Sequence, residues 1–68
     1  MKTRTALHII ETIIRPEMEK ADVIGRRAVN IFFHEVWMEV YETVADELTA
    51  NGYKVHITVR DTTIHIEW

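Results

Sequence analysis

The chain has no cysteine, and its four histidines are the residues best suited to bind a metal ion or to take part in catalysis. His34 and Glu35 match the first half of the zinc-protease signature, in which two histidines lie four residues apart on one helix face. The second histidine position is Met38, and a thioether does not replace an imidazole on zinc. The signature is therefore broken.

A second group of potential ligands, His56, His65 and Glu67, lies at alternate positions of two predicted strands. Two imidazoles and a carboxylate on one polar face could bind a divalent transition ion. The alternative is ordinary polar strand surface, and we favour it here, as we do for His8 and Glu11 one turn apart on a predicted helix. We predict no metal and no cofactor.

The residue arrangements of the common enzyme classes are not found in the sequence. The chain has no serine, and its only glycines are Gly25 and Gly52, which is too few for a phosphate-binding loop. The carboxylates of Glu35 and Glu39 belong to an exposed helix face rather than a cleft, so they do not form an acid–base pair. We predict a non-enzymatic protein.

Charge is distributed unevenly along the chain, whose net charge is −3. Residues 1–27 hold six Lys or Arg against four acids, whereas residues 28–52 hold five acids and no Lys or Arg. No base lies at i+4 to compensate these acids within a helix, and Asp46 and Glu47 lie in its last turn, where the helix dipole disfavours them. Local rules broken repeatedly are typical of a functional surface.

We therefore predict a small protein-binding or regulatory module that acts through an acidic helix face. Its partner would be a protein with a basic surface, and one concrete version is a phage-type inhibitor that occupies the nucleic-acid site of its target. The alternatives are a face that only keeps the protein soluble, a nucleic-acid-binding protein that uses the N-terminal bases, and a structural homo-oligomer subunit. The predicted partner-binding residues are Glu35, Met38, Glu39, Glu42 and Asp46.

The elements that must position these residues follow from apolar periodicity. Residues 5–14 have helical spacing, although a strand is an alternative, and Pro16 suits the first turn of a second helix. A helical stripe then continues to Ala50, with Phe32, Phe33, Trp37 and Tyr41 on its apolar face and Asn51-Gly52 as its stop. This long helix is either continuous or bent near Gly25, where glycine costs about 1 kcal/mol.

Residues 53–68 alternate between apolar and polar and predict a β-hairpin. Pairing Arg60 with Thr63 places Val59 opposite Ile64, Ile57 opposite Ile66, Val55 opposite Trp68 and His56 opposite Glu67. A slip of one residue would oppose apolar to polar side chains throughout. The hairpin must pack on the helices, which predicts a single α+β domain over residues 1–68 with the order ααββ.

A chain of 68 residues without disulfides has a thin stability margin, which favours self-association. The last strand carries only one charge, Glu67, and no proline, so it is weakly protected as a sheet edge. We predict a homodimer edge formed by Ile64, Ile66 and Trp68. With no membrane span and a poor signal-peptide pattern, we expect a cytoplasmic protein.

Overall fold

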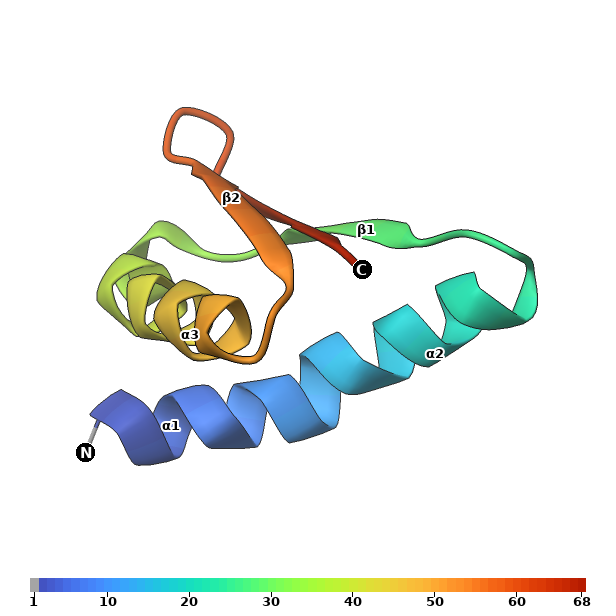
Figure 1. The fold of residues 1–68 in the computed structure, drawn as a ribbon. Coiled ribbons are helices and arrows are strands. Elements are labelled where there is room, and N and C mark those ends of the chain that lie inside the picture. The colour runs from blue at the N-terminus through green and yellow to red at the C-terminus, as the bar shows by residue number, and fades with distance from the viewer. Residues whose placement is uncertain (1) are drawn as a thin grey trace.

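The computed structural model describes residues 2–68, with the backbone alone at Lys2, and confirms the predicted α+β class. The chain forms a long helix, a strand, a second helix and two further strands (Figure 1). The elements in order are α1 (Lys2–Ile9), a π-helical turn (Ile10–Ile14), α2 (Arg15–Val23), β1 (Ala28–Phe32), a 3-10 turn (Glu35–Trp37), α3 (Met38–Ala50), β2 (Lys54–Thr58) and β3 (Thr63–Glu67).

A π-helical turn joins α1 and α2 into one long helix. Pro16 has no N–H for a helical hydrogen bond, and just before it the N–H of Arg15 donates to the carbonyl of Ile10, five residues back. The extra residue in this turn rotates the buried face by one position. Consequently Ile14 is fully buried while Ile13 is 43 % exposed, although both carry the same side chain.

The long helix formed by α1, the π-helical turn and α2 ends at Val23, and Gly25 follows as its stop. The helix predicted from Pro16 to Ala50 is therefore interrupted near Gly25 and is not continuous. Gly25 has a φ of 81°, its N–H donates to the carbonyl of Asp22, and the N–H of Arg26 donates to the carbonyl of Ala21. These two bonds define a Schellman motif, which needs a left-handed residue. The same pattern closes α3, where Gly52 has a φ of 92° and the N–H of Tyr53 donates to the carbonyl of Leu48.

Residues 28–32 form strand β1, so the prediction that they continue a long helix is wrong. Val29 and Ile31 point towards the helices, while Asn30 and Phe32 point to solvent. Asn30 is the only polar residue in this segment, so the sequence shows no clear alternation, and the same residues also fit a helical spacing. Pairing with β3 decides between the two, because it supplies a ladder of hydrogen bonds that the sequence pattern does not reveal.

The sheet has three antiparallel strands in the order β1-β3-β2. Strand β3 is central, with Ile66 between Val29 and Val55, and Ile64 between Ile31 and Ile57. The prediction that Ile64, Ile66 and Trp68 form a free edge is therefore wrong. Both sides of β3 are occupied within the same chain, and the backbone N–H of Trp68 donates to the carbonyl of Arg27 beside it.

The hairpin of β2 and β3 has the predicted alternation but a different register. Thr58 pairs with Thr63, which leaves a four-residue loop and shifts every predicted pair by two positions. His56 therefore lies opposite His65 rather than Glu67. A two-residue turn favours a positive φ at its central positions, and in this loop only Thr62 has one, at 45°.

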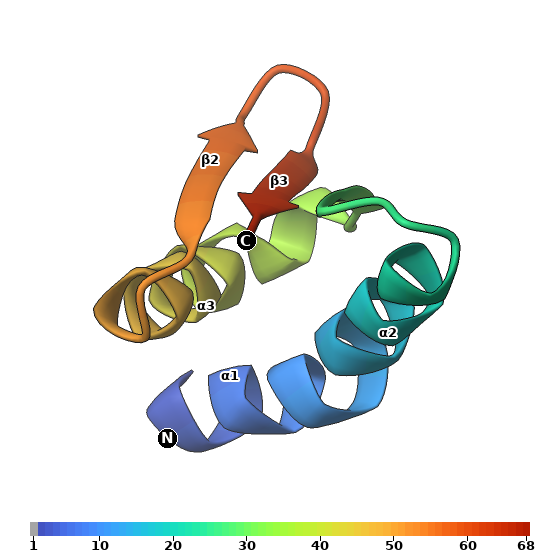
Figure 2. The same ribbon diagram turned by 45° about the vertical axis from the view of Figure 1, so that its right-hand side comes forward.

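The core lies between one face of the sheet and the helices, as Figures 1 and 2 show. Its fully buried large side chains are Ile14, Val44, Ile64 and Ile66. At one end the rings of Phe33 and Tyr41 stack with centroids 4.2 Å apart, and burial raises the pKa of the Tyr41 phenol. Trp37 and Phe32, which were predicted to lie in this core, are 45 % and 78 % exposed because α3 begins only after them.

Candidate functional site

The acidic residues predicted from the sequence share one exposed side of α3 and the turn before it. Glu39, Glu42 and Asp46 follow one another at three- and four-residue spacing on α3, and Glu35 lies one turn earlier in the 3-10 segment. All four side chains are exposed. Because the opposite side of α3 carries the buried Tyr41, Val44 and Leu48, packing against the core turns the acidic side outward.

The ion pairs within residues 2–68 leave most of this surface uncompensated. Arg15 pairs with Glu11 at 3.1 Å and Lys20 with Glu17 at 3.5 Å, both within the long helix. None of the ion pairs in the described part of the chain involves Glu35, Glu42 or Asp46. Like charges at i and i+4 destabilise a helix by roughly 0.2–0.5 kcal/mol per pair, so this arrangement carries a cost.

Met38, the fifth predicted contact residue, differs from the others. It is half-buried and packs against the core, which contradicts the expectation of an exposed methionine.

His34 lies just before the acidic segment. Its Nδ1 accepts a hydrogen bond from the N–H of Val36 at 3.2 Å and caps the 3-10 turn. The structure therefore gives His34 a structural role at the start of this segment.

The outer face of the sheet carries the histidines that first suggested chemistry. The Nδ1 of His65 lies 2.7 Å from Oδ1 of Asn30, and its Nε2 lies 3.0 Å from Oε1 of Glu67. The hydrogen bond from His65 lowers the pKa of the Glu67 carboxyl. His56 lies opposite His65 on β2, but within residues 2–68 no group of three or more His, Cys, Asp or Glu could hold a metal ion.

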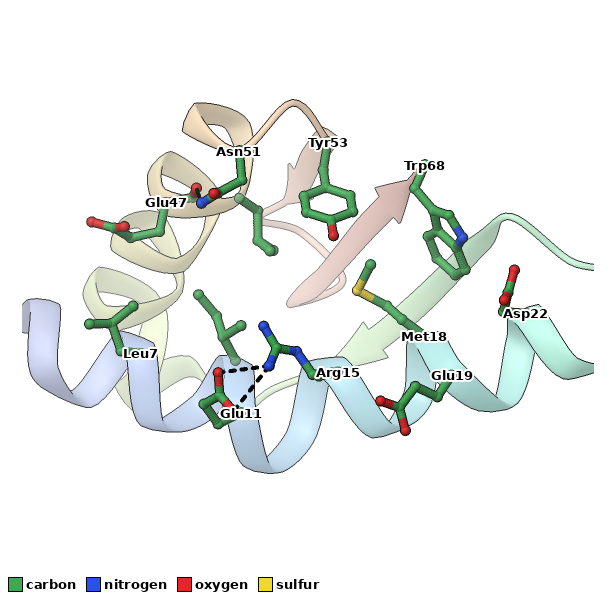
Figure 3. A pocket seen from close by; sticks show the side chains of 12 residues that line it. Leu7, Glu11, Arg15, Met18, Glu19, Asp22, Glu47, Asn51, Tyr53 and Trp68 are labelled. Atoms are coloured by element: carbon green, nitrogen blue, oxygen red, sulfur yellow. Dashed lines mark hydrogen bonds and ion pairs between the residues drawn. The ribbon is translucent and has the colours of Figure 1, made fainter.

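A groove that sequence reasoning did not anticipate lies between the long helix and the end of α3. It has a volume of about 460 Å³, and Met18, Tyr53 and Trp68 point into it from three different segments (Figure 3). One feature of the sequence could have indicated part of this groove. The stop at Asn51-Gly52 predicts a Schellman motif, and the two outer residues of that motif, here Leu48 and Tyr53, commonly make an apolar contact. Both of these residues line the groove.

Among the charged residues that line the groove, acids outnumber bases. Four carboxylates line it together with one base, Arg15, whose guanidinium is held by Glu11 (Figure 3). In the same view Asp22 lies at the end of the groove where Trp68 enters. The lining carboxylates are those of Glu11, Glu19, Asp22 and Glu47. The groove thus combines aromatic walls with an excess of negative charge.

Comparisons with known proteins do not supply a function. No protein-family model matches the chain, and no curated protein and no solved structure is significantly similar to it. Within residues 2–68, none of the helices combines the length and apolarity that a bilayer span requires.

Proposed function

We propose that this protein is a small non-enzymatic binding module that docks a protein partner with a basic surface through its acidic α3 face. The observation that carries the proposal is the row of exposed carboxylates at Glu35, Glu42 and Asp46, which lack a cation among the described residues. A basic partner would relieve the mutual repulsion among these carboxylates, which remains while the surface is unoccupied.

The nucleic-acid site of another protein is one basic surface that fits this description. Such a site is lined by Lys and Arg that neutralise phosphates, and a row of carboxylates offers the same charge. In this version the module is an inhibitor of the kind that phages encode. The alternative that this chain binds nucleic acid through its N-terminal bases is weakened, because two of them, Arg15 and Lys20, are already paired with carboxylates.

The proposal is tested by neutralising the face in a variant with Glu35→Gln, Glu42→Gln and Asp46→Asn. The wild type and the variant are used to capture proteins from the native host, and retained proteins are eluted with increasing salt. A matched control with Glu17→Gln, Asp61→Asn and Glu67→Gln changes the net charge equally at other exposed positions. We expect the control to retain the same partner as the wild type and the α3 variant to lose it.

If the α3 variant retains the same partner, with the same elution salt as the wild type, the acidic-face proposal is wrong. Circular dichroism of both variants checks that each is folded. All of these substitutions lie at exposed positions, and the contacts that the control removes, Glu17 with Lys20 and Glu67 with His65, are surface ion pairs that contribute little to stability.

Self-association is a second candidate function, favoured by exposed apolar side chains. Val23 is 86 % exposed and Ile24 68 % exposed, next to each other at the end of α2. A homodimer that covers this end would remove both from water. Sedimentation equilibrium of the wild type and of a Val23→Lys, Ile24→Lys variant tests it: we expect a dimer for the wild type and a monomer for the variant.

A further inference from the structure

The groove between the long helix and the end of α3 is a second surface, separate from the acidic row on α3. Its walls come from Met18 on α2, Tyr53 after α3, and Trp68 after β3. These side chains are half-buried, so part of each faces the open space of the groove. A volume of about 460 Å³ lies in the lower half of the range of small ligand sites, about 300–1,000 Å³.

The charged side chains that line the groove favour the binding of a cation. The guanidinium of Arg15 lies 3.1 Å from Oε1 and 3.3 Å from Oε2 of Glu11, so this base and this acid compensate each other. The other three carboxylates, those of Glu19, Asp22 and Glu47, have no cation partner among the described residues. Of these three, Asp22 lies at the Trp68 end of the groove, whereas the carboxylates of Glu19 and Glu47 point away from Tyr53 and Trp68 (Figure 3). A positively charged group beside Trp68 would therefore be complemented by Asp22.

The aromatic walls favour one kind of cation over another. A planar guanidinium stacks on aromatic faces and binds a carboxylate with two parallel hydrogen bonds, whereas an ammonium is a compact, strongly hydrated charge. Trp68 is the best type of aromatic surface for such a cation, and Asp22 lies at the same end of the groove (Figure 3). We propose that the groove binds an arginine side chain presented by a peptide segment of a partner protein.

Trp68 provides a direct readout of this binding. The chain has two tryptophans, and replacing the other in a Trp37→Phe background leaves Trp68 as the only one. This protein is titrated into the millimolar range with a blocked tripeptide, acetyl-Gly-Arg-Gly-amide. We expect a saturable change in Trp68 fluorescence, together with amide shifts at residues 18, 22, 53 and 68 in a heteronuclear correlation spectrum.

Matched ligands and variants test whether the charge of the arginine and the carboxylate of Asp22 are responsible for this binding. The same tripeptide with citrulline has the shape of arginine without its charge, and we expect at least tenfold weaker binding. Asp22→Asn should also weaken arginine binding about tenfold, the factor that corresponds to losing 1.4 kcal/mol. Glu42→Gln with Asp46→Asn should leave it unchanged, so failure of the acidic-face proposal and failure of this one are distinguishable.

Three results would overturn the inference. The first is the absence of a saturable signal with the arginine peptide while the protein remains folded. The second is equal binding of the citrulline peptide, which would remove the charge argument. The third is equal binding of the matching lysine peptide or of spermidine, which would identify a general cation site instead of one for arginine.

Discussion

At the scale of single residues, burial has its clearest electrostatic effect at Tyr41. The phenol lies in the core against Phe33, and its pKa is raised because burial disfavours the charged form. In the unfolded chain the phenol ionises near pH 10. The folded protein therefore holds its proton at pH values where the unfolded chain releases it.

This difference predicts an alkaline loss of stability. As the pH rises above about 10, the unfolded state gains from ionising Tyr41 and the free energy of unfolding falls. The fall continues until the pH passes the raised pKa of the folded state. Urea denaturation at pH 7 and pH 10.5 should show a smaller loss in Tyr41→Phe than in the wild type.

At the scale of elements, two glycines end the two helical segments. A Cβ at Gly25 would meet no atom within 4 Å, so the backbone conformation alone opposes a side chain there. With a φ of 81°, the left-handed conformation costs an L-residue roughly 1–2 kcal/mol. The turn from α2 into β1 depends on this one residue.

Gly25→Ala should lower the free energy of unfolding by about 1 kcal/mol, which lowers Tm by roughly 4–8 °C in a domain of this size. Gly25→Asn should lose less, because asparagine tolerates the left-handed region. Thermal denaturation followed by circular dichroism measures both. Equal melting temperatures for the wild type and Gly25→Ala would contradict the Schellman role of Gly25.

Elements defined by neighbouring residues could be predicted from the sequence, whereas those defined by distant partners could not. The stop at Asn51-Gly52 and the acidic side of α3 depend on residues a few positions apart. Strand β1 depends on β3, which pairs Val29 with Ile66 across 37 positions. The spacing of Val29 and Phe33 fits a helix equally well, so only the tertiary partner distinguishes the two.

The candidate sites divide in the same way. The carboxylates of α3 lie on one helix, so their spacing alone predicts that they share a face. The groove is assembled from the long helix, the end of α3 and the segments that carry Tyr53 and Trp68. No pattern within any one of these segments indicates that aromatic and acidic side chains will meet, and the groove could not be found in advance.

At the scale of the whole molecule, stability depends on the central strand. Ile66 is fully buried and packs in the core that joins the sheet to the helices. Ile66→Val should cost about 0.5–1.5 kcal/mol through lost burial and a small cavity. Ile13→Val, at a position that is 43 % exposed, is the control and should change the free energy of unfolding by less than about 0.5 kcal/mol. Chemical denaturation measures the free energy of unfolding of both variants, and an equal decrease in the two would contradict the central place of Ile66 in the core.

The central place of β3 also determines when the sheet can form during synthesis. Within residues 2–68, strands β1 and β2 both pair with residues 63–67 and not with each other. A ribosome-bound chain can build its helices early, but both strands lack a partner until those residues have emerged. Folding of the sheet is therefore delayed until after their translation, and an unfinished chain exposes two strand edges that can aggregate.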